Sequence, residues 1–297
     1  MNSYTDALES YLIAEEGFMD KVKSAGKVAV NALKKAIQWL MNKLRSLVTK
    51  IKNIRVVDKR DIENKISTIK DESQKKLDKA NKDLVEARKE SDENRQKYLD
   101  EASSKTISQT HARVKFYNCD TLYRTINGIN SQIINIYKEI PRLRNFIKRE
   151  DLDFQDYTKV KWLLGEMFVE GTGKSIIISS EVIEDLNEDI NIMIEEFESE
   201  NGRAYHNMLS VGVKTSIESC IKNISTILHE MQYIADNIGS RTFQSTTVMS
   251  THNSKVDSRY PETFNRIVSG CNKSIASLTS VQSALSKILT HTECFVR

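Results

Sequence analysis

The chain has 297 residues, of which 39% are hydrophobic and 29% charged, and its formal net charge is +3. Only two prolines and ten glycines interrupt it, so we predict an all-α fold of long helices. The sequence has no run of about 18 apolar residues and no apolar signal segment, so we expect neither a membrane-spanning helix nor a secretory signal. Its four cysteines form no CxxC pair, and we expect them to be reduced, buried thiols.

The first 54 residues divide into an acidic and a basic part. Residues 1–16 contain a predicted short acidic helix, which ends before Gly17. Residues 17–54 form the strongest amphipathic pattern of the chain, with apolar residues every three or four positions. The other side of this predicted helix is filled by cations, and Asp20 is the single acidic residue of the segment. These cations are Lys21, Lys23, Lys27, Lys34, Lys35, Lys43, Arg45, Lys50 and Lys52.

Three interpretations of the basic helix remain open on sequence alone. Its lysines can neutralise nucleic-acid phosphates without reading the base sequence. The helix can instead lie in a membrane interface, with Phe18 and Trp39 as anchors. The third interpretation is a bundle helix whose solvent-exposed side is basic.

Residues 55–106 are predicted to form a charged, coiled-coil-like arm. Residues 54–106 hold 14 basic and 13 acidic residues, and a thin apolar seam runs through residues 58–104. Alanine, serine and asparagine occupy several seam positions, so the arm needs a partner helix, in the same chain or in a homo-oligomer. The alternative is a solvated single helix held by charge pairs four residues apart.

Residues 107–297 are predicted to form a helical bundle without a clear strand. We expect a helix at 107–151 that is interrupted near Pro141, because proline disfavours helical geometry in the residue before it. A Ser/Thr-rich loop is predicted at 240–259. The other expected helices cover 154–168, a stretch from Ser180, 204–237 with Gly239 as its C-cap, and a last helix opened by Pro261.

No catalytic constellation stands out in the sequence. The GTGKS sequence at 171–175 resembles the end of a phosphate-binding loop, but Phe168 occupies the position where that motif needs its first glycine. His291 and Cys294 are a single pair, whereas zinc requires three or four ligands. The carboxylates of 181–200 fit a solvated helix face or a docking surface for the basic helix. We therefore expect a protein that is not an enzyme and binds no cofactor.

The N-terminal sequence MNSYTDALESYLIAEEGF ends in a short apolar-x-Glu pattern directly before the basic helix. It resembles the capsid-targeting propeptides of large tailed phages of the T-even type and their jumbo relatives. The resemblance implies a tag that takes the protein into the prohead, where the maturation protease cuts after a glutamate. Ile13-Ala14-Glu15 fits a cut before Glu16, and Ala14-Glu15-Glu16 fits a cut before Gly17.

Such a cut would change the charge of the protein. Residues 1–16 contain four acids and no Lys or Arg, so their loss raises the side-chain net charge from +3 to +7. The resemblance implies an internal head protein, located in the capsid interior after a stage in the host cytoplasm, with capsid proteins and the maturation protease as partners. The basic helix would contact DNA or the shell. The alternative is a membrane-active or partner-binding helical protein.

Overall fold

A computed structural model describes residues 18–87, 119–148, 162–170, 172–198, 207–248 and 259–297. The predicted all-α class is confirmed, because long helices make up most of this part of the chain. These helices are α2 (Phe18–Asn53), α3 (Lys59–Ala87), α5 (Asp120–Lys148), α7 (Ser180–Glu198), α8 (Val211–Val248) and α9 (Arg259–His291).

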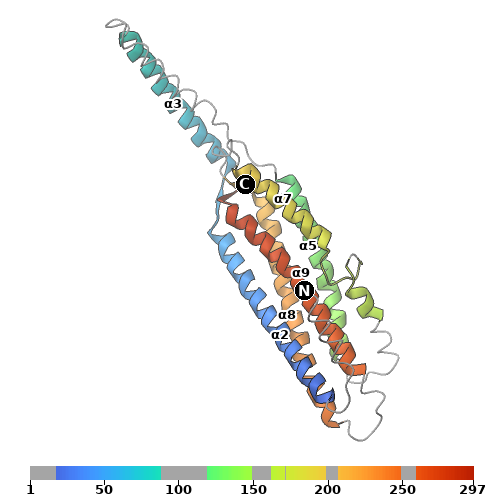
Figure 1. The fold of residues 1–297 in the computed structure, drawn as a ribbon. Helices are drawn as coiled ribbons and strands as arrows, with labels where there is room; N and C mark the ends of the chain where they lie inside the picture. Colours follow the sequence, from blue (N-terminus) through green and yellow to red (C-terminus); the bar gives the residue numbers. More distant parts are fainter. Residues whose placement is uncertain (1–17, 88–118, 149–161, 171, 199–206, 249–258) are drawn as a thin grey trace.

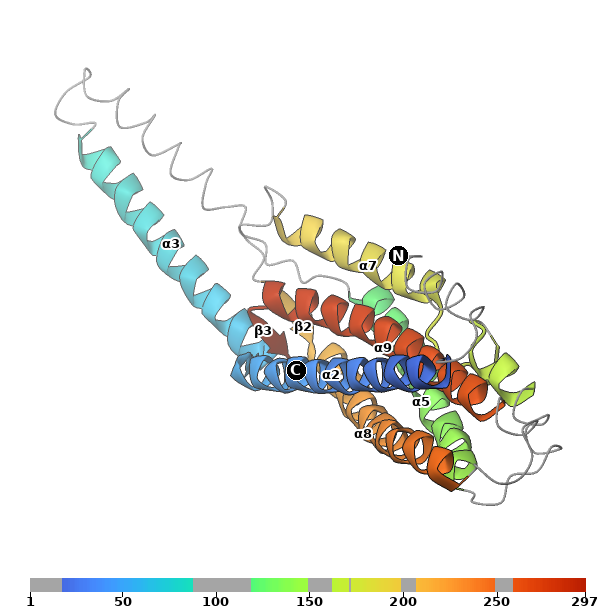
Figure 2. The ribbon, with the colours of Figure 1, turned by 60° about the horizontal axis from the view of Figure 1, so that its bottom comes forward.

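Helix α8 is the central packing element of the bundle. It packs against α5, α2 and α9, while α7 packs against α5 and α9 (Figures 1 and 2). Hydrogen bonds between side chains of α5 and α8 show the direction of these two helices relative to each other. Asn127 and Arg144 of α5 bond in the same order to Ser216 and Glu230 of α8, so these two helices run parallel.

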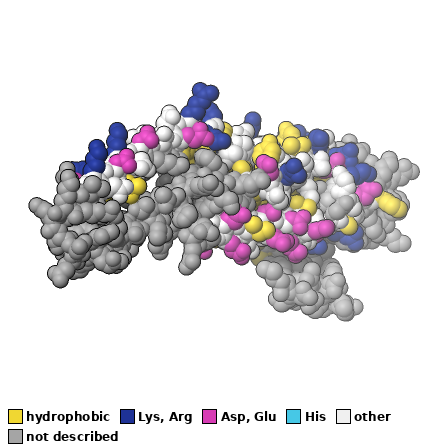
Figure 3. Space-filling view, turned by 90° about the horizontal axis from the view of Figure 1, so that it is seen from above, with side chains coloured by type: hydrophobic (Ala, Val, Ile, Leu, Met, Phe, Trp, Pro, Cys, Tyr) yellow, Lys and Arg dark blue, Asp and Glu magenta, His cyan; other side chains and the backbone are white. Residues whose placement is uncertain are grey.

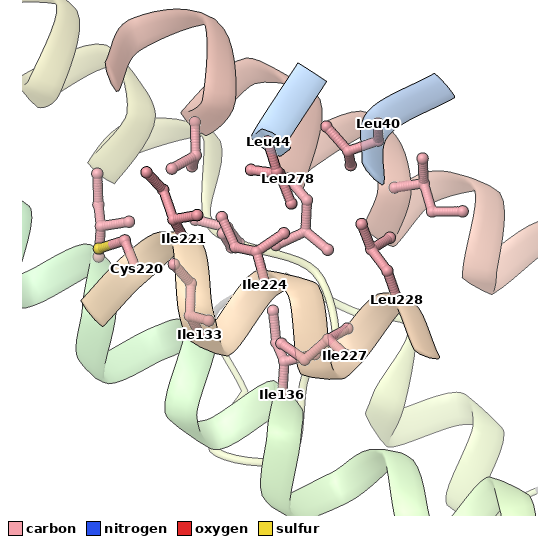
Figure 4. Close-up of a cluster of buried hydrophobic side chains, with 14 of the residues drawn as sticks. Leu40, Leu44, Ile133, Ile136, Cys220, Ile221, Ile224, Ile227, Leu228 and Leu278 are labelled. Atoms are coloured by element: carbon pink, nitrogen blue, oxygen red, sulfur yellow. The ribbon is translucent and has the colours of Figure 1, made fainter. Parts of the chain in front are cut away.

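The core lies where α2, α5, α8 and α9 meet. Figure 4 shows leucines and isoleucines from all four helices pointing toward one another around α8. Each fully buried side chain of this type contributes roughly 1.5 to 3 kcal/mol to folding. The apolar stripe predicted for the basic helix is part of this core, and its buried members are Val30, Leu33, Ile37, Leu40, Leu44, Leu47 and Ile51. Helix α2 is thus a member of the bundle.

A small parallel sheet lies at one end of the bundle, although no clear strand was predicted. It consists of β1 (Arg55–Val57), β2 (Met208–Ser210) and β3 (Cys294–Val296), in the order β1-β3-β2. Phe295 of the middle strand is fully buried, which anchors the sheet in the core. The prediction was wrong here because a strand of three residues is too short to show an alternating pattern.

Helix α3 extends away from the bundle, starting directly after the sheet (Figure 1). The amide of Arg297 donates to the carbonyl of Val57 at 3.1 Å, and the amide of Lys59 donates to the carbonyl of Arg297 at 3.4 Å. These bonds fix the base of α3. The remainder of the predicted arm, from residue 88 onward, lies outside the described residues, and its pairing stays a prediction.

Three helix boundaries differ from those predicted. Helix α5 continues through Pro141, because the flanking Ile140 and Leu143 are fully buried and offset the lost hydrogen bond. Helix α8 continues past Gly239 to Val248, so the loop predicted at 240–259 is wrong for residues 240–248. Extending a formed helix costs far less free energy than nucleating one, so α8 can continue through a glycine. The N-terminus of α8 is at Val211, because β2 precedes it.

Candidate functional site

The outward side of α2 carries a row of cations, which we call the basic face. Its described members are exposed: Lys27, Lys35, Lys43, Arg45, Lys50 and Lys52. No acid follows Asp20 in this helix. Lys21 and Lys23 also belong to α2, but their side chains lie outside the described residues. The helix therefore presents positive charge on the side opposite its buried stripe.

Most of this charge is not neutralised within the described part of the chain. Lys35, Lys43 and Lys52 form no ion pair with a described residue there. The guanidinium of Arg45 donates to the side-chain oxygen of Asn42 at 3.2 Å, and the Lys50 ammonium donates to the Thr290 hydroxyl at 3.3 Å. These neutral partners leave both charges intact, so the face can attract an external polyanion.

Lys34 differs from the other predicted cations. Its ammonium lies 2.7 Å from a carboxylate oxygen of Asp236 on α8, and the lysine side chain is only 35% exposed. Lys34 is at the edge of the helix next to α8, where it takes part in the bundle interface. Its charge is already balanced, so it contributes less to the basic face than its neighbours.

Trp39 lies on the basic face and is 48% exposed. The Lys43 ammonium is 5.5 Å from the centre of its ring, a cation–π distance. The structure therefore points the predicted membrane anchor outward. The stripe that would enter a bilayer beside it is buried in the bundle, with Leu33, Ile37 and Leu40 fully inaccessible.

The candidate cleavage site at Ile13, Ala14, Glu15, Glu16 and Gly17 lies outside the described residues. The described part of α2 begins at Phe18, directly after that site. Cleavage before Glu16 or Gly17 stays a prediction from the sequence.

The loop that resembles a phosphate-binding motif is occupied by contacts within the protein. The Lys174 ammonium lies 2.6 Å from a carboxylate oxygen of Glu166. The buried Ser175 hydroxyl donates to the carbonyl of Ile177 at 3.0 Å. The following Ile176 and Ile178 are buried in the core, so this segment acts as a packed connection before α7. Gly171 lies outside the described residues.

The described residues include no group of three or more histidines, cysteines or acids that could hold a metal ion. A ring nitrogen of His291 lies 2.9 Å from the carbonyl oxygen of Lys287, one helical turn away. Burial raises the pKa of the Cys220 and Cys271 thiols to about 12, which makes them poor nucleophiles at neutral pH. Burial, more than the nearby charge of Glu293, also raises the pKa of Cys294.

The acidic helix α7 does not dock on the basic helix in this structure. It packs against α5 and α9, and α9 lies between α7 and α2 in both ribbon views (Figures 1 and 2). Its apolar residues Leu186, Ile190 and Met193 point into the common core. Its carboxylates therefore remain on a separate surface.

No family model matches the chain, and searches among curated proteins and solved structures gave no match. Among the described helices, none combines the length and the apolar character needed to cross a membrane. The basic face of α2 is the candidate site that the geometry of the described residues favours.

Proposed function

We propose that this chain is a non-enzymatic internal head protein of a phage virion, and that the basic face of α2 binds packaged DNA without base specificity. The tag-like sequence of residues 1–16 supports targeting to the prohead and processing by the maturation protease. The composition and position of the basic face support contact with DNA.

A single observation carries the DNA proposal: six exposed cations follow one side of a long helix that is anchored in the bundle by its opposite side. From Lys27 to Lys52 this face spans about 38 Å at 1.5 Å per residue. Duplex DNA presents roughly one phosphate charge per 1.7 Å of its axis, so a helix of this length can contact several phosphates. The binding energy would come from the release of counterions.

Insertion of α2 into a membrane would require the bundle to open. The stripe of α2 would have to leave the core before it could enter a bilayer, and each fully buried Leu or Ile so exposed costs roughly 1.5 to 3 kcal/mol. The exposed apolar side chains of α2, Val28, Trp39 and Val48, offer only a small apolar contact. The experiment on DNA therefore includes liposomes as a competing target.

Fluorescence anisotropy of a labelled duplex, titrated with the full chain at several salt concentrations, tests DNA binding. If about five cations each neutralise a phosphate, log affinity falls with log salt with a slope of about −4.5. The double variant Lys35→Ala/Lys43→Ala loses two phosphate contacts, so its slope should be less steep by about two units. Lys138→Ala is the control, because Lys138 is exposed on α5.

Equal affinity and slope in the double variant and the wild type would contradict DNA binding by this face. So would strong binding to neutral liposomes accompanied by a blue shift of the tryptophan fluorescence. Mass spectrometry of purified particles tests processing separately. The expected N-terminal residue is Glu16 or Gly17, and an intact Met1 or absence from the particles would refute that part of the proposal.

A further inference from the structure

The outward side of α7 carries a row of carboxylates, which we call the acidic face. It consists of the exposed Glu181, Glu184, Asp185, Glu188 and Glu195. None of these five forms an ion pair with a described residue, and α7 contains no Lys or Arg. Figure 3 shows acidic side chains clustered over the region where α7 lies in Figure 1.

These carboxylates repel one another within the helix. Glu181 and Asp185 are four residues apart, as are Glu184 and Glu188, and like charges at this spacing destabilise a helix. Glu195 lies near the C-terminal end of α7, where the helix dipole disfavours negative charge. An external row of cations would relieve both effects.

The basic face of α2 has the dimensions of such a partner. The acidic face runs about 21 Å from Glu181 to Glu195, and the cations from Lys35 to Lys52 run about 26 Å at the same rise of about 1.5 Å per residue. Each face also has an exposed apolar side chain among its charges that could contact the other. Ile192 of α7 is 47% exposed, and Trp39 of α2 is 48% exposed. Two such residues could pack together between the charged rows.

The two faces cannot meet within one molecule as it is folded, because α9 separates α7 from α2 (Figures 1 and 2). We propose that the chain self-associates, with the acidic face of α7 in one copy docked on the basic face of α2 in the next. A contact between two different surfaces is heterologous, so it produces rings or open chains of molecules. This inference does not depend on DNA binding.

Charge reversal tests the contact with the full chain in sedimentation velocity. Wild type should associate at about 50 mM salt and dissociate at about 0.5 M, where charges are screened within roughly 4 Å. Glu184→Lys/Glu188→Lys and Lys35→Glu/Lys43→Glu should each weaken self-association about tenfold or more. Mixed in equal amounts, the two variants should co-assemble, since one has a basic α7 and the other an acidic α2. Lys138→Glu on α5 is the matched control and should associate like wild type.

Three results would overturn the proposal. The first is a wild type that stays monomeric at low salt. The second is association that survives both charge reversals, which would place the contact elsewhere, for example along α3. The third is failure of the two variants to co-assemble when both retain wild-type helical circular dichroism. Glu184→Lys/Glu188→Lys leaves the basic face of α2 intact, so loss of self-association with retained DNA binding separates this inference from the proposed function.

Discussion

Replacing Gly270 by alanine should destabilise the protein, although this substitution usually favours a helix. Gly270 is buried in α9, and the ring of Phe168 packs directly against it. A Cβ atom at this position would lie 2.0 Å from the nearest ring carbon, far inside van der Waals contact. The ring of Phe168 would therefore have to move away from the core.

Two opposing contributions set the magnitude. Alanine is better than glycine in a helix interior by about 1 kcal/mol. Forcing an extra methyl group into a packed site costs about 1 to 3 kcal/mol, and the higher end applies when a ring must be displaced. We expect a net decrease of about 1 to 2 kcal/mol in the free energy of unfolding for Gly270→Ala, because the clash outweighs the propensity.

Urea unfolding of a double-mutant cycle with Phe168→Ala measures the two contributions separately. Without the ring, the same Gly270→Ala change should stabilise the protein by about 1 kcal/mol. The coupling energy between the two positions should then be roughly 2 to 3 kcal/mol. If Gly270→Ala stabilises the wild type as much as it stabilises the Phe168→Ala variant, the argument from packing fails.

Three further outcomes can be checked. Hydrogen bonds from the Ser180 hydroxyl and amide lower the pKa of Glu170 below its ordinary 4.5. The charged carboxylate therefore adds stability above that pH, and the addition is lost as pH falls through the lowered value. Glu170→Gln should cost less than about 1 kcal/mol at pH 7 in urea unfolding, because the group is exposed, and this cost should shrink as the pH falls below 4.5. A cost that does not change with pH would contradict this. Native protein treated with iodoacetamide at pH 8 should leave Cys220 and Cys271 unmodified, as mass spectrometry would detect. Pro141→Ala should raise the free energy of unfolding by about 1 to 3 kcal/mol, and a lower melting temperature would show that the proline is needed.

The long helices could be predicted from the sequence because their apolar periodicity extends over many turns. The stripe from Val30 to Ile51 is buried as its spacing predicts. The start of α7 at Ser180 was also predicted correctly, and so was a start of α9 near Pro261. In each case the signal is local, since one helix face or one cap carries it.

Features that depend on distant partners could not be predicted in this way. The three strands come from widely separated parts of the chain and become strands only when they pair. The passage of α5 through Pro141 depends on buried neighbours around it, which a rule about the residue before proline does not include.

The same limit applies to the candidate site. The sequence identified the cations of α2 but could not separate Lys34, which pairs with Asp236, from Lys35, which has no described ion pair. The two lysines are adjacent in sequence and lie about 100° apart around the helix. Only the position of α8 decides which of them is neutralised. The acidic row of α7 was visible in the sequence, but its separation from α2 by α9 was not.

The order of the strands in the small sheet has a consequence for biosynthesis. β3 lies between β1 and β2, and β1 pairs with no strand other than β3 among the described residues. While the ribosome is making the chain, β1 emerges early but has no partner until residues 294–296 follow. The hydrogen bonds at the base of α3 therefore cannot form until residues 294–297 have been synthesised. A polypeptide that stopped before Cys294 would fold its early helices without fixing the direction of α3, so that direction is set only after strand β3 has been synthesised.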